Sequence, residues 1–255
     1  MLLYPIIRII DTLFDKKGNR NTLVVENFGA QMKKFIAFTL AETLIVIGVI
    51  GIVSALTLPN LNSSTGDKER VAKVKKIYQN LQDAFGRAEA VYGPYEEWIK
   101  TTDTTDGLKS KRIGERITEF MKLSKNCETS TDAACNGPSI TPDYYKVITA
   151  DGTWISFNRS EIDVDIDGLQ KGPSEYGVDL FRFVINENLG IVPNGTQLNL
   201  TFPNMLRDLE ARRGYAAYWI IKYDNADYLQ IKEVSGDKAK CKNDNIMTED
   251  NPRCK

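Results

Sequence analysis

The sequence predicts an α+β protein in which one long N-terminal helix, with a transmembrane first half, packs against a C-terminal head containing an antiparallel sheet. Three observations support this prediction. A nearly uncharged apolar run covers 38–58, a single apolar stripe follows at 71–88, and β-branched and aromatic runs separated by turn residues occupy 144–185. We therefore divide the chain into an N-terminal segment (1–37), a transmembrane helix (38–59), its amphipathic continuation (60–92) and a globular head (93–255).

The apolar run from Phe38 to Leu58 contains 21 residues and one charge, Glu42. At about 1.5 Å of rise per residue it would span roughly 32 Å as a helix, enough to cross a hydrocarbon core of about 30 Å. Its apolar residues lie on all sides of that helix, unlike the one-sided stripe of a surface helix. The sequence therefore predicts a single membrane-spanning helix that ends at Pro59.

The residues around this run resemble the cleavage and methylation motif of type IV prepilins and type II secretion pseudopilins. A basic leader ends in the small residue Ala37, Phe38 opens the apolar run, and Glu42 is the fifth residue after the expected cut. The resemblance covers FTLAETLIVIGVIGIVSALTLP and departs from the family at Ala37, where glycine is usual. It implies cleavage between Ala37 and Phe38 by a prepilin peptidase, N-methylation of Phe38, and assembly roles for Glu42 and Pro59.

Glu42 is also informative without the family. A carboxylate in a membrane helix costs about 2.5–3.5 kcal/mol at mid-bilayer, so such residues are candidates for function. One interpretation places Glu42 near the helix end, where it reaches the interface and the positive end of the helix dipole. The resemblance implies instead that Glu42 pairs with the new amine of Phe38 on a neighbouring subunit, because a buried charge needs a partner.

Residues 1–31 do not resemble a secretory signal. Their apolar patch is brief and interrupted by Pro5 and Arg8, and no small-residue cleavage site follows it. We expect translation to begin at Met32, which leaves a six-residue leader, MKKFIA. The alternative is a cytoplasmic extension that the same peptidase removes.

Charge alone leaves the orientation in the membrane open. Lys33 and Lys34 favour a cytoplasmic N-terminus, but basic residues also outnumber acidic ones at 67–76, beyond the span. The cysteines and the family resemblance place the head outside the cytoplasm. The expected location is therefore the cytoplasmic (inner) membrane, with a single pass, and a filament in the periplasm or on the cell surface.

The second apolar pattern is a stripe that alternates steps of three and four residues. This spacing predicts an amphipathic helix that ends near Tyr92, before Gly93-Pro94. We interpret the stripe as the packing face for the head, with a partner-binding face as the alternative. The stripe consists of Val71, Val74, Tyr78, Leu81, Phe85 and Ala88.

The head mixes helical and strand patterns. Helical spacing predicts a second helix within 106–125. The run YYKVITADGTWISF (144–157) predicts a β-hairpin, and two further strands are expected at 161–167 and 178–185. The segment 203–222 begins as a helix, while its end is ambiguous between helix and strand.

The stretch IDVDIDGLQKGPSEYGVDLFRF resembles a segment of many bacterial prepilin-like proteins, with Asp167 and Ser174 where asparagine is usual. Asp163, Asp165 and Asp167 before Gly168 also match the start of a calcium loop, although Ser174 stands where a bidentate glutamate is expected. Alternating aspartates are equally typical of the solvated face of a strand, which is our preferred interpretation. We expect no cofactor, with calcium at the three aspartates as the alternative.

Four cysteines lie in the head, and four cysteines permit three pairings. Local pairing, Cys127 with Cys135 and Cys241 with Cys254, would close two polar loops and stabilise the head by roughly 2–3 kcal/mol each. Free thiols would require a cytoplasmic head, and zinc is disfavoured because no pair has C-x-x-C spacing. The sequence therefore predicts two local disulfides.

Composition and resemblance together lead to a structural role. The chain has no histidine, which removes Ser-His-Asp triads, Cys-His dyads and histidine metal sites, so we expect no enzyme. A net charge of −1 argues against a nucleic-acid partner, unless the filament serves DNA uptake. The resemblance implies a subunit of a type IV pilus-like or type II secretion pseudopilus filament. Its partners would be the prepilin peptidase, other pilin or pseudopilin subunits, an inner-membrane assembly platform and the lipid bilayer.

The alternative is a membrane-anchored exoplasmic binding or enzymatic domain that uses the helix only as an anchor. Glu42 separates the two classes, because an anchored domain would lose that carboxylate without consequence.

Overall fold

The computed structural model describes residues 40–130, 132, 134–137 and 144–254, so the predicted leader and Phe38 lie outside the described residues. The chain divides into two compact units, Met1–Ile52 and Val53–Lys255, and each is described by itself. The described part of the first unit is helical throughout. Of the described elements, the second unit contains the sheets and the helices other than α2, which confirms the α+β class.

The long helix predicted from the sequence is α2 (Leu40–Tyr92). It ends where expected: Gly93 has φ 80°, and its N–H donates to Glu89 O at 3.0 Å, as in a helix closed by a left-handed glycine. Side chains of α2 are described at 43–52 and from 66 onward. Among the described residues, no helix is both long enough and apolar enough to cross a membrane.

The stripe on the second half of α2 is buried as predicted. Val74, Leu81 and Ala88 are fully enclosed, and Phe85 is nearly so. Tyr78 is partly buried, and its ring stacks on Phe183 with centroids 5.9 Å apart. The stripe therefore belongs to one core with the sheet, which confirms that it is the packing face for the head.

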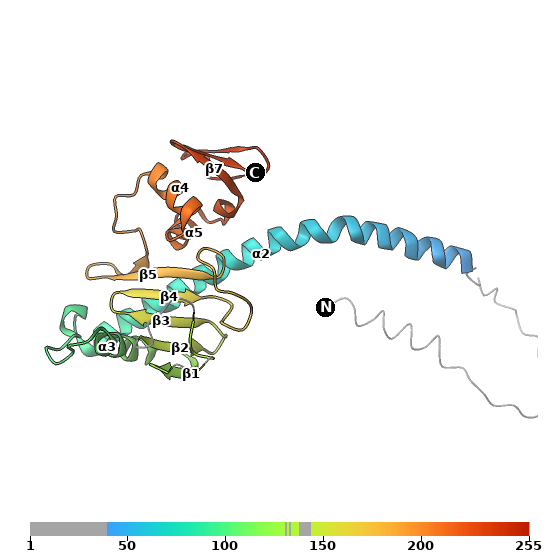
Figure 1. Ribbon diagram of the computed structural model, residues 1–255. Helices are drawn as coiled ribbons and strands as arrows, with labels where there is room; N and C mark the ends of the chain where they lie inside the picture. The colour runs from blue at the N-terminus through green and yellow to red at the C-terminus, as the bar shows by residue number, and fades with distance from the viewer. Residues whose placement is uncertain (1–39, 131, 133, 138–143, 255) are drawn as a thin grey trace, which may run out of the picture. The chain divides into compact units, whose positions relative to one another are not determined.

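That sheet has six antiparallel strands in chain order, and α2 passes behind it (Figure 1). The predicted hairpin joins β2 to β3, and the two predicted strands are β4 and β5. Alternate side chains, including Ile155, Val164 and Phe183, enter the core shared with α2. The strands are β1 (Leu123–Glu128), β2 (Tyr145–Thr149), β3 (Trp154–Asn158), β4 (Glu161–Asp165), β5 (Leu180–Asn186) and β6 (Gly190–Pro193).

The second predicted helix is α3 (Asp106–Thr118), which lies within the expected range 106–125. Thr105 caps its N-terminus, and the Thr105 hydroxyl accepts from Leu108 N at 3.2 Å. Gly114 lets α3 approach the sheet closely, because a Cβ there would lie 2.1 Å from the Tyr145 ring. Residues 123–128, which follow α3, form β1, and pairing with β2 satisfies their backbone groups at the sheet edge.

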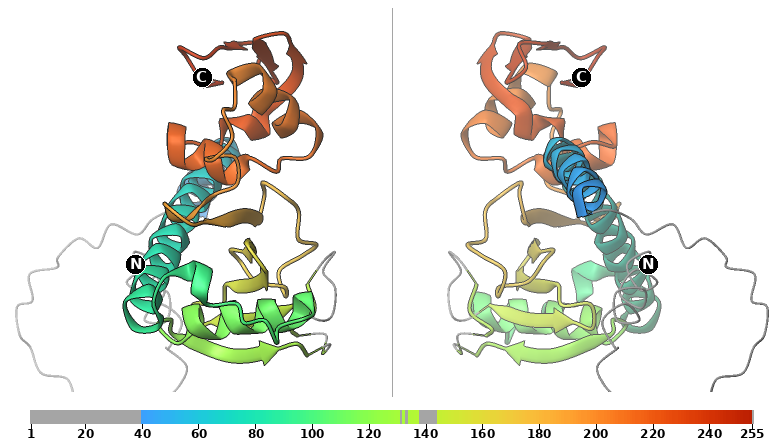
Figure 2. Two further views of the ribbon diagram at one scale, coloured as in Figure 1. Left: turned by 90° about the vertical axis from the view of Figure 1, so that its left-hand side faces the viewer. Right: turned by 90° about the vertical axis from the view of Figure 1, so that its right-hand side faces the viewer.

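The ambiguous segment near residue 220 is helical. α4 (Phe202–Ala211) packs against a second sheet at the C-terminal end of the chain, whereas α5 (Ala216–Tyr223) packs against β5 and β6 of the first sheet (Figure 2). Ala216, Trp219 and Ile220 are buried at helical spacing, and Asp224 closes α5 with φ 55°. Two short 3-10 turns, η1 (Tyr95–Glu97) and η2 (Asp227–Gln230), and the strands β7 (Ile231–Ser235), β8 (Lys238–Cys241) and β9 (Ile246–Met247) complete the chain.

Candidate functional site

The first part of α2 carries an apolar surface. From residue 43 to residue 52 its side chains are uncharged, and Ile45 and Ile47 are each 66% exposed. Contiguous apolar surface of this kind marks contact with a membrane or another protein. The other large apolar side chains exposed there are Leu44, Val46, Val49, Ile50 and Ile52.

The predicted processing and assembly residues fall around this surface. Ala37 and Phe38 lie outside the described residues. Glu42 lies in the first turn of α2, and Pro59 lies further along the same helix, but neither side chain is among those described. Their predicted roles therefore stay predictions.

The aspartates of β4 are not on a solvated strand face, so that interpretation was wrong. Asp163 and Asp165 point away from α2, yet they are only 6% and 1% exposed. Hydrogen bonds compensate for the burial of each carboxylate. Arg182, on the neighbouring strand β5, donates from Nε and Nη2 to the two oxygens of Asp163 at 2.8 and 2.9 Å. Such bidentate, charge-assisted bonds offset the cost of burying both ions.

Asp165 holds the loop that joins β4 to β5. Its Oδ1 accepts from Gly168 N at 2.8 Å and from Asp167 N at 3.3 Å, and its Oδ2 accepts from the Ser174 hydroxyl. Gly168 has φ 81°, and a Cβ there would lie 2.4 Å from Gly152 O. The Asp-x-Asp-Gly pattern thus organises a turn through a carboxylate that binds backbone N–H groups.

These contacts fit calcium poorly. The oxygens of Asp163 face a guanidinium, and those of Asp165 accept from N–H and O–H donors. Burial, followed by the hydrogen bond to Asp165 and the charge of that carboxylate, raises the pKa of Asp167. Within the described part of the chain, no three His, Cys, Asp or Glu side chains are grouped to hold a metal. Hydrogen bonds within the head therefore account for the burial of Asp163 and Asp165.

The loop between β4 and β5 also joins three parts of the head. Arg70 on α2 donates from Nε to Val178 O at 2.5 Å, and the Tyr228 hydroxyl donates to Gly177 O at 2.6 Å. Gly177 has φ 76°, and a Cβ there would lie 2.7 Å from the Arg213 Cβ. The loop thus contacts α2, Arg213 before α5, and η2. The resemblance of 162–183 to prepilin-like proteins indicated this segment, although the sequence did not show its contacts.

Both predicted disulfides are present, Cys127–Cys135 and Cys241–Cys254, with Cα atoms 5.8 and 5.6 Å apart. The first closes a loop against the face of the sheet opposite α2. There Lys146 Nζ donates to Ser130 O at 2.8 Å, and Trp154 Nε1 donates to Cys135 O at 3.1 Å. Lys146 is fully buried, so this loop covers a charged side chain.

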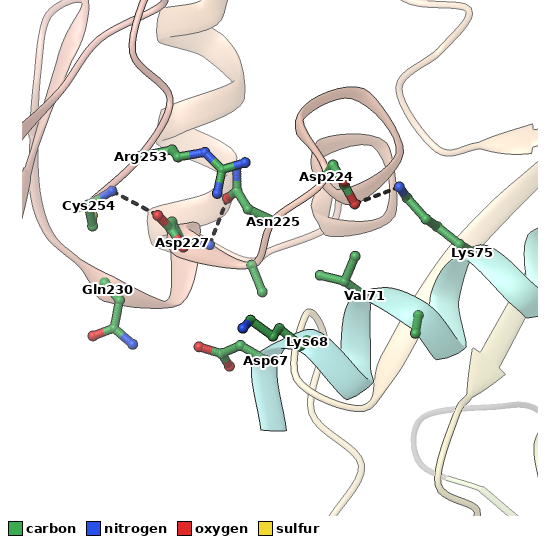
Figure 3. A pocket seen from close by; sticks show the side chains of 12 residues that line it. Asp67, Lys68, Val71, Lys75, Asp224, Asn225, Asp227, Gln230, Arg253 and Cys254 are labelled. Carbon is green, nitrogen blue, oxygen red and sulfur yellow. Dashed lines mark hydrogen bonds and ion pairs between the residues drawn. The ribbon is translucent and has the colours of Figure 1, made fainter. Parts of the chain in front are cut away.

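A groove of about 700 Å³ lies between α2 and the C-terminal residues (Figure 3). Val71 and Ala226 line the groove but are almost entirely buried, and charged side chains surround them. Its volume falls within the range of about 300–1,000 Å³ typical of ligand sites. It is also lined by Asp67, Lys68, Ala72, Lys75, Asp224, Asn225, Asp227, Gln230, Arg253 and Cys254.

The acidic side chains of the groove are satisfied within the chain. Lys75 Nζ lies 2.6 Å from Asp224 Oδ1, and Arg70 Nη1 lies 2.6 Å from Asp67 Oδ1. Asp227 accepts from Cys254 N at 2.9 Å, beside the second disulfide. In contrast, the side chains of Lys68 and Arg253 form no hydrogen bond or ion pair with any described residue. The groove therefore has an excess of unpaired positive charge, which no sequence motif indicated.

Comparison of the chain with protein families, with curated proteins and with solved structures finds no match. The candidate sites therefore depend on the residues and geometry described above.

Proposed function

We propose that this protein is a structural subunit of a type IV pilus-like or type II secretion pseudopilus filament. A prepilin peptidase would process it, and it would assemble through its N-terminal hydrophobic helix. The observation that supports this proposal most strongly is the division of α2. Its first part has exposed apolar side chains at 43–52, whereas its second part is the packing face for an α+β head.

The energetics favour burying the first part of α2. Removing a large aliphatic side chain from water contributes about 1.5–3 kcal/mol. Seven such side chains are more than half exposed between Leu44 and Ile52. Lipid would cover them in the stored subunit, and helices of neighbouring subunits would cover them in the filament. In this scheme the segment 38–59 is the membrane anchor before assembly.

Charge pairing would then set the register between subunits. Glu42 lies in the first turn of α2, where the helix dipole favours a negative charge. Cleavage before Phe38 creates an amine that enters the same apolar environment. A carboxylate from a neighbouring subunit would compensate it, because an unpaired buried charge is strongly destabilising.

The head has features suited to a secreted compartment and to fixed attachment. Two disulfides are typical of proteins outside the cytoplasm. The contact between Arg70 and Val178 and the stacking of Tyr78 on Phe183 fix the sheet to α2.

Mass analysis of the N-terminus of the membrane-extracted protein tests this proposal. The expected N-terminal residue is Phe38 carrying one methyl group, and the matched variant Ala37→Gly should be cleaved at least as completely. An uncleaved N-terminus under conditions in which the peptidase processes its other substrates would contradict the proposal and favour an anchored exoplasmic domain.

A further inference from the structure

We propose that Asn199 is an N-linked glycosylation site, modified outside the cytoplasm by a transferase that uses a lipid-linked, pyrophosphate-activated glycan. The motif Asn199-Leu200-Thr201 lies in the connection between β6 and α4, which can be followed in Figure 1. An asparagine followed two positions later by serine or threonine is the acceptor pattern for this modification in surface loops of exported proteins. The inference goes beyond the proposed function and requires only that the head is exported, which its two disulfides favour.

The backbone of the motif presents both of its recognition groups to solvent. Asn199 and Thr201 are exposed, whereas Leu200 between them is half-buried. Leu200 Cδ1 packs against Gly195, where it would lie 2.7 Å from an added Cβ, and Thr201 has an extended backbone with φ −74° and ψ 152°. In an extended segment, residues two positions apart share a face. The amide of Asn199 and the hydroxyl of Thr201 can therefore enter one active site together.

Neither recognition group has a role inside the head. The Asn199 amide forms no hydrogen bond with any described residue. Thr201 is the N-cap of α4, a position at which a threonine hydroxyl ordinarily accepts from a backbone N–H of the first helical turn. Here the Thr201 side chain makes no such bond. A transferase can therefore bind the hydroxyl, and a glycan can be added to the amide, without breaking a contact of the fold.

The neighbouring motif, Asn194-Gly195-Thr196, has the same residue types but its groups are already used. Asn194 Nδ2 donates to Gly214 O at 3.2 Å. The Thr196 hydroxyl donates to Pro193 O at 2.8 Å. Both the nitrogen that would be modified and the hydroxyl that would be recognised are thus engaged within the head.

The two remaining motifs lie in regular structure. Asn158-Arg159-Ser160 forms the turn between β3 and β4, where Asn158 pairs with Glu161 and its Oδ1 is buried. Arg159 N also donates to Ser110 Oγ at 3.1 Å, which holds this turn against α3. The motif at 62–64 lies within α2, so its backbone is helical rather than extended. Of the four motifs, the one at Asn199 is exposed, extended and without internal hydrogen bonds from its side chains.

The modification is a substitution at the anomeric carbon of the donor sugar. Asn199 Nδ2 forms a bond to that carbon, the bond from the carbon to the pyrophosphate oxygen breaks, and the lipid pyrophosphate leaves. One amide proton passes to a base of the transferase, and no oxidant or reductant is needed. Gln197 stands two positions before Asn199, so the transferase belongs to the class that requires no acidic residue there. The glycan would also shield Leu198, which is 47% exposed.

The test is mass spectrometry of the full chain extracted from the membranes of the cells that naturally produce it. Trypsin should release residues 183–207, which contain both Asn194 and Asn199. We expect this peptide to carry a glycan, which electron-transfer fragmentation places on Asn199. Asn199→Gln and Thr201→Val should abolish the modification, whereas Thr201→Ser, which keeps the hydroxyl, should retain it. Asn194→Gln removes the other motif of the peptide and is the matched control, which should leave the modification unchanged.

Several results would overturn the inference. They are an unmodified 183–207 peptide from the wild type, a glycan on Asn194, and a glycan that appears only in Gln197→Asp. The outcome is separable from that of the proposed function. A glycan on Asn199 in a chain with an uncleaved N-terminus would support this inference and contradict the filament proposal, whereas an N-terminal Phe38 without the glycan would do the reverse.

Discussion

Replacing Asp165 by alanine should unfold the β4–β5 loop locally and destabilise the head. The change removes two hydrogen bonds from backbone N–H groups, of Asp167 and Gly168, and one from the Ser174 hydroxyl. Hydrogen bonds to a charged group contribute about 1.5–3 kcal/mol each, but the freed N–H groups of the loop can form hydrogen bonds with water instead. We therefore expect the free energy of unfolding to fall by about 3 kcal/mol. For a domain of this size the melting temperature should fall by about 6–12 °C.

The assay is thermal unfolding of the full chain in a mild detergent, with and without roughly 5 mM calcium. This concentration would nearly saturate a calcium site of the extracellular kind. Asp237→Ala, at an exposed turn position, is the control and should change the melting temperature little. A melting temperature for Asp165→Ala equal to that of the wild type would refute the structural role. A calcium-dependent rise in the wild type that disappears in Asp165→Ala would show that the carboxylate is a metal ligand instead.

Two further predictions concern the rest of the head. Hydrogen bonds of 2.6 and 3.0 Å from Arg112 lower the pKa of Asp103 to about 2. The pairing of Asp103 with Arg112 therefore stabilises the fold above about pH 4, and this contribution is lost as the pH falls towards 2. In Asp103→Asn the melting temperature should fall less between pH 4 and pH 2 than it does in the wild type. Replacing Cys127 and Cys135 by serine should lower the free energy of unfolding by about 2–3 kcal/mol. It should also make Lys146 reactive to acetylation, which mass spectrometry would measure. The Cys241→Ser, Cys254→Ser pair is the control and should leave Lys146 protected.

Local patterns made much of the fold predictable. The stripe from Val71 to Ala88 repeats at helical spacing, so its buried face could be assigned before any contact was known. The β2–β3 hairpin was visible because Asp151-Gly152 separates two strand-forming runs. The disulfide pairs were predictable because each joins cysteines close in sequence, separated by 8 and 13 positions.

Features that depend on distant partners were missed. Asp163 and Asp165 alternate with apolar residues, as residues on a solvated strand face do, and the arginine that pairs with Asp163 comes from another strand, 19 positions away. β1 was not predicted, because it is polar, irregular in register and at the sheet edge. The groove joins 67–75 to 224–254, so no local signal could indicate it.

The assembly of Glu42 variants tests the central claim most directly. Glu42→Ala and Glu42→Asp would be compared with the wild type for co-purification with sheared filaments, and Glu69→Ala, at an exposed glutamate of the same helix, is the control. The account predicts that Glu42→Ala inserts and folds normally but is strongly depleted from filaments, that Glu42→Asp is intermediate, and that Glu69→Ala assembles like the wild type. Normal incorporation of Glu42→Ala would contradict the account and favour a helix that serves only as an anchor.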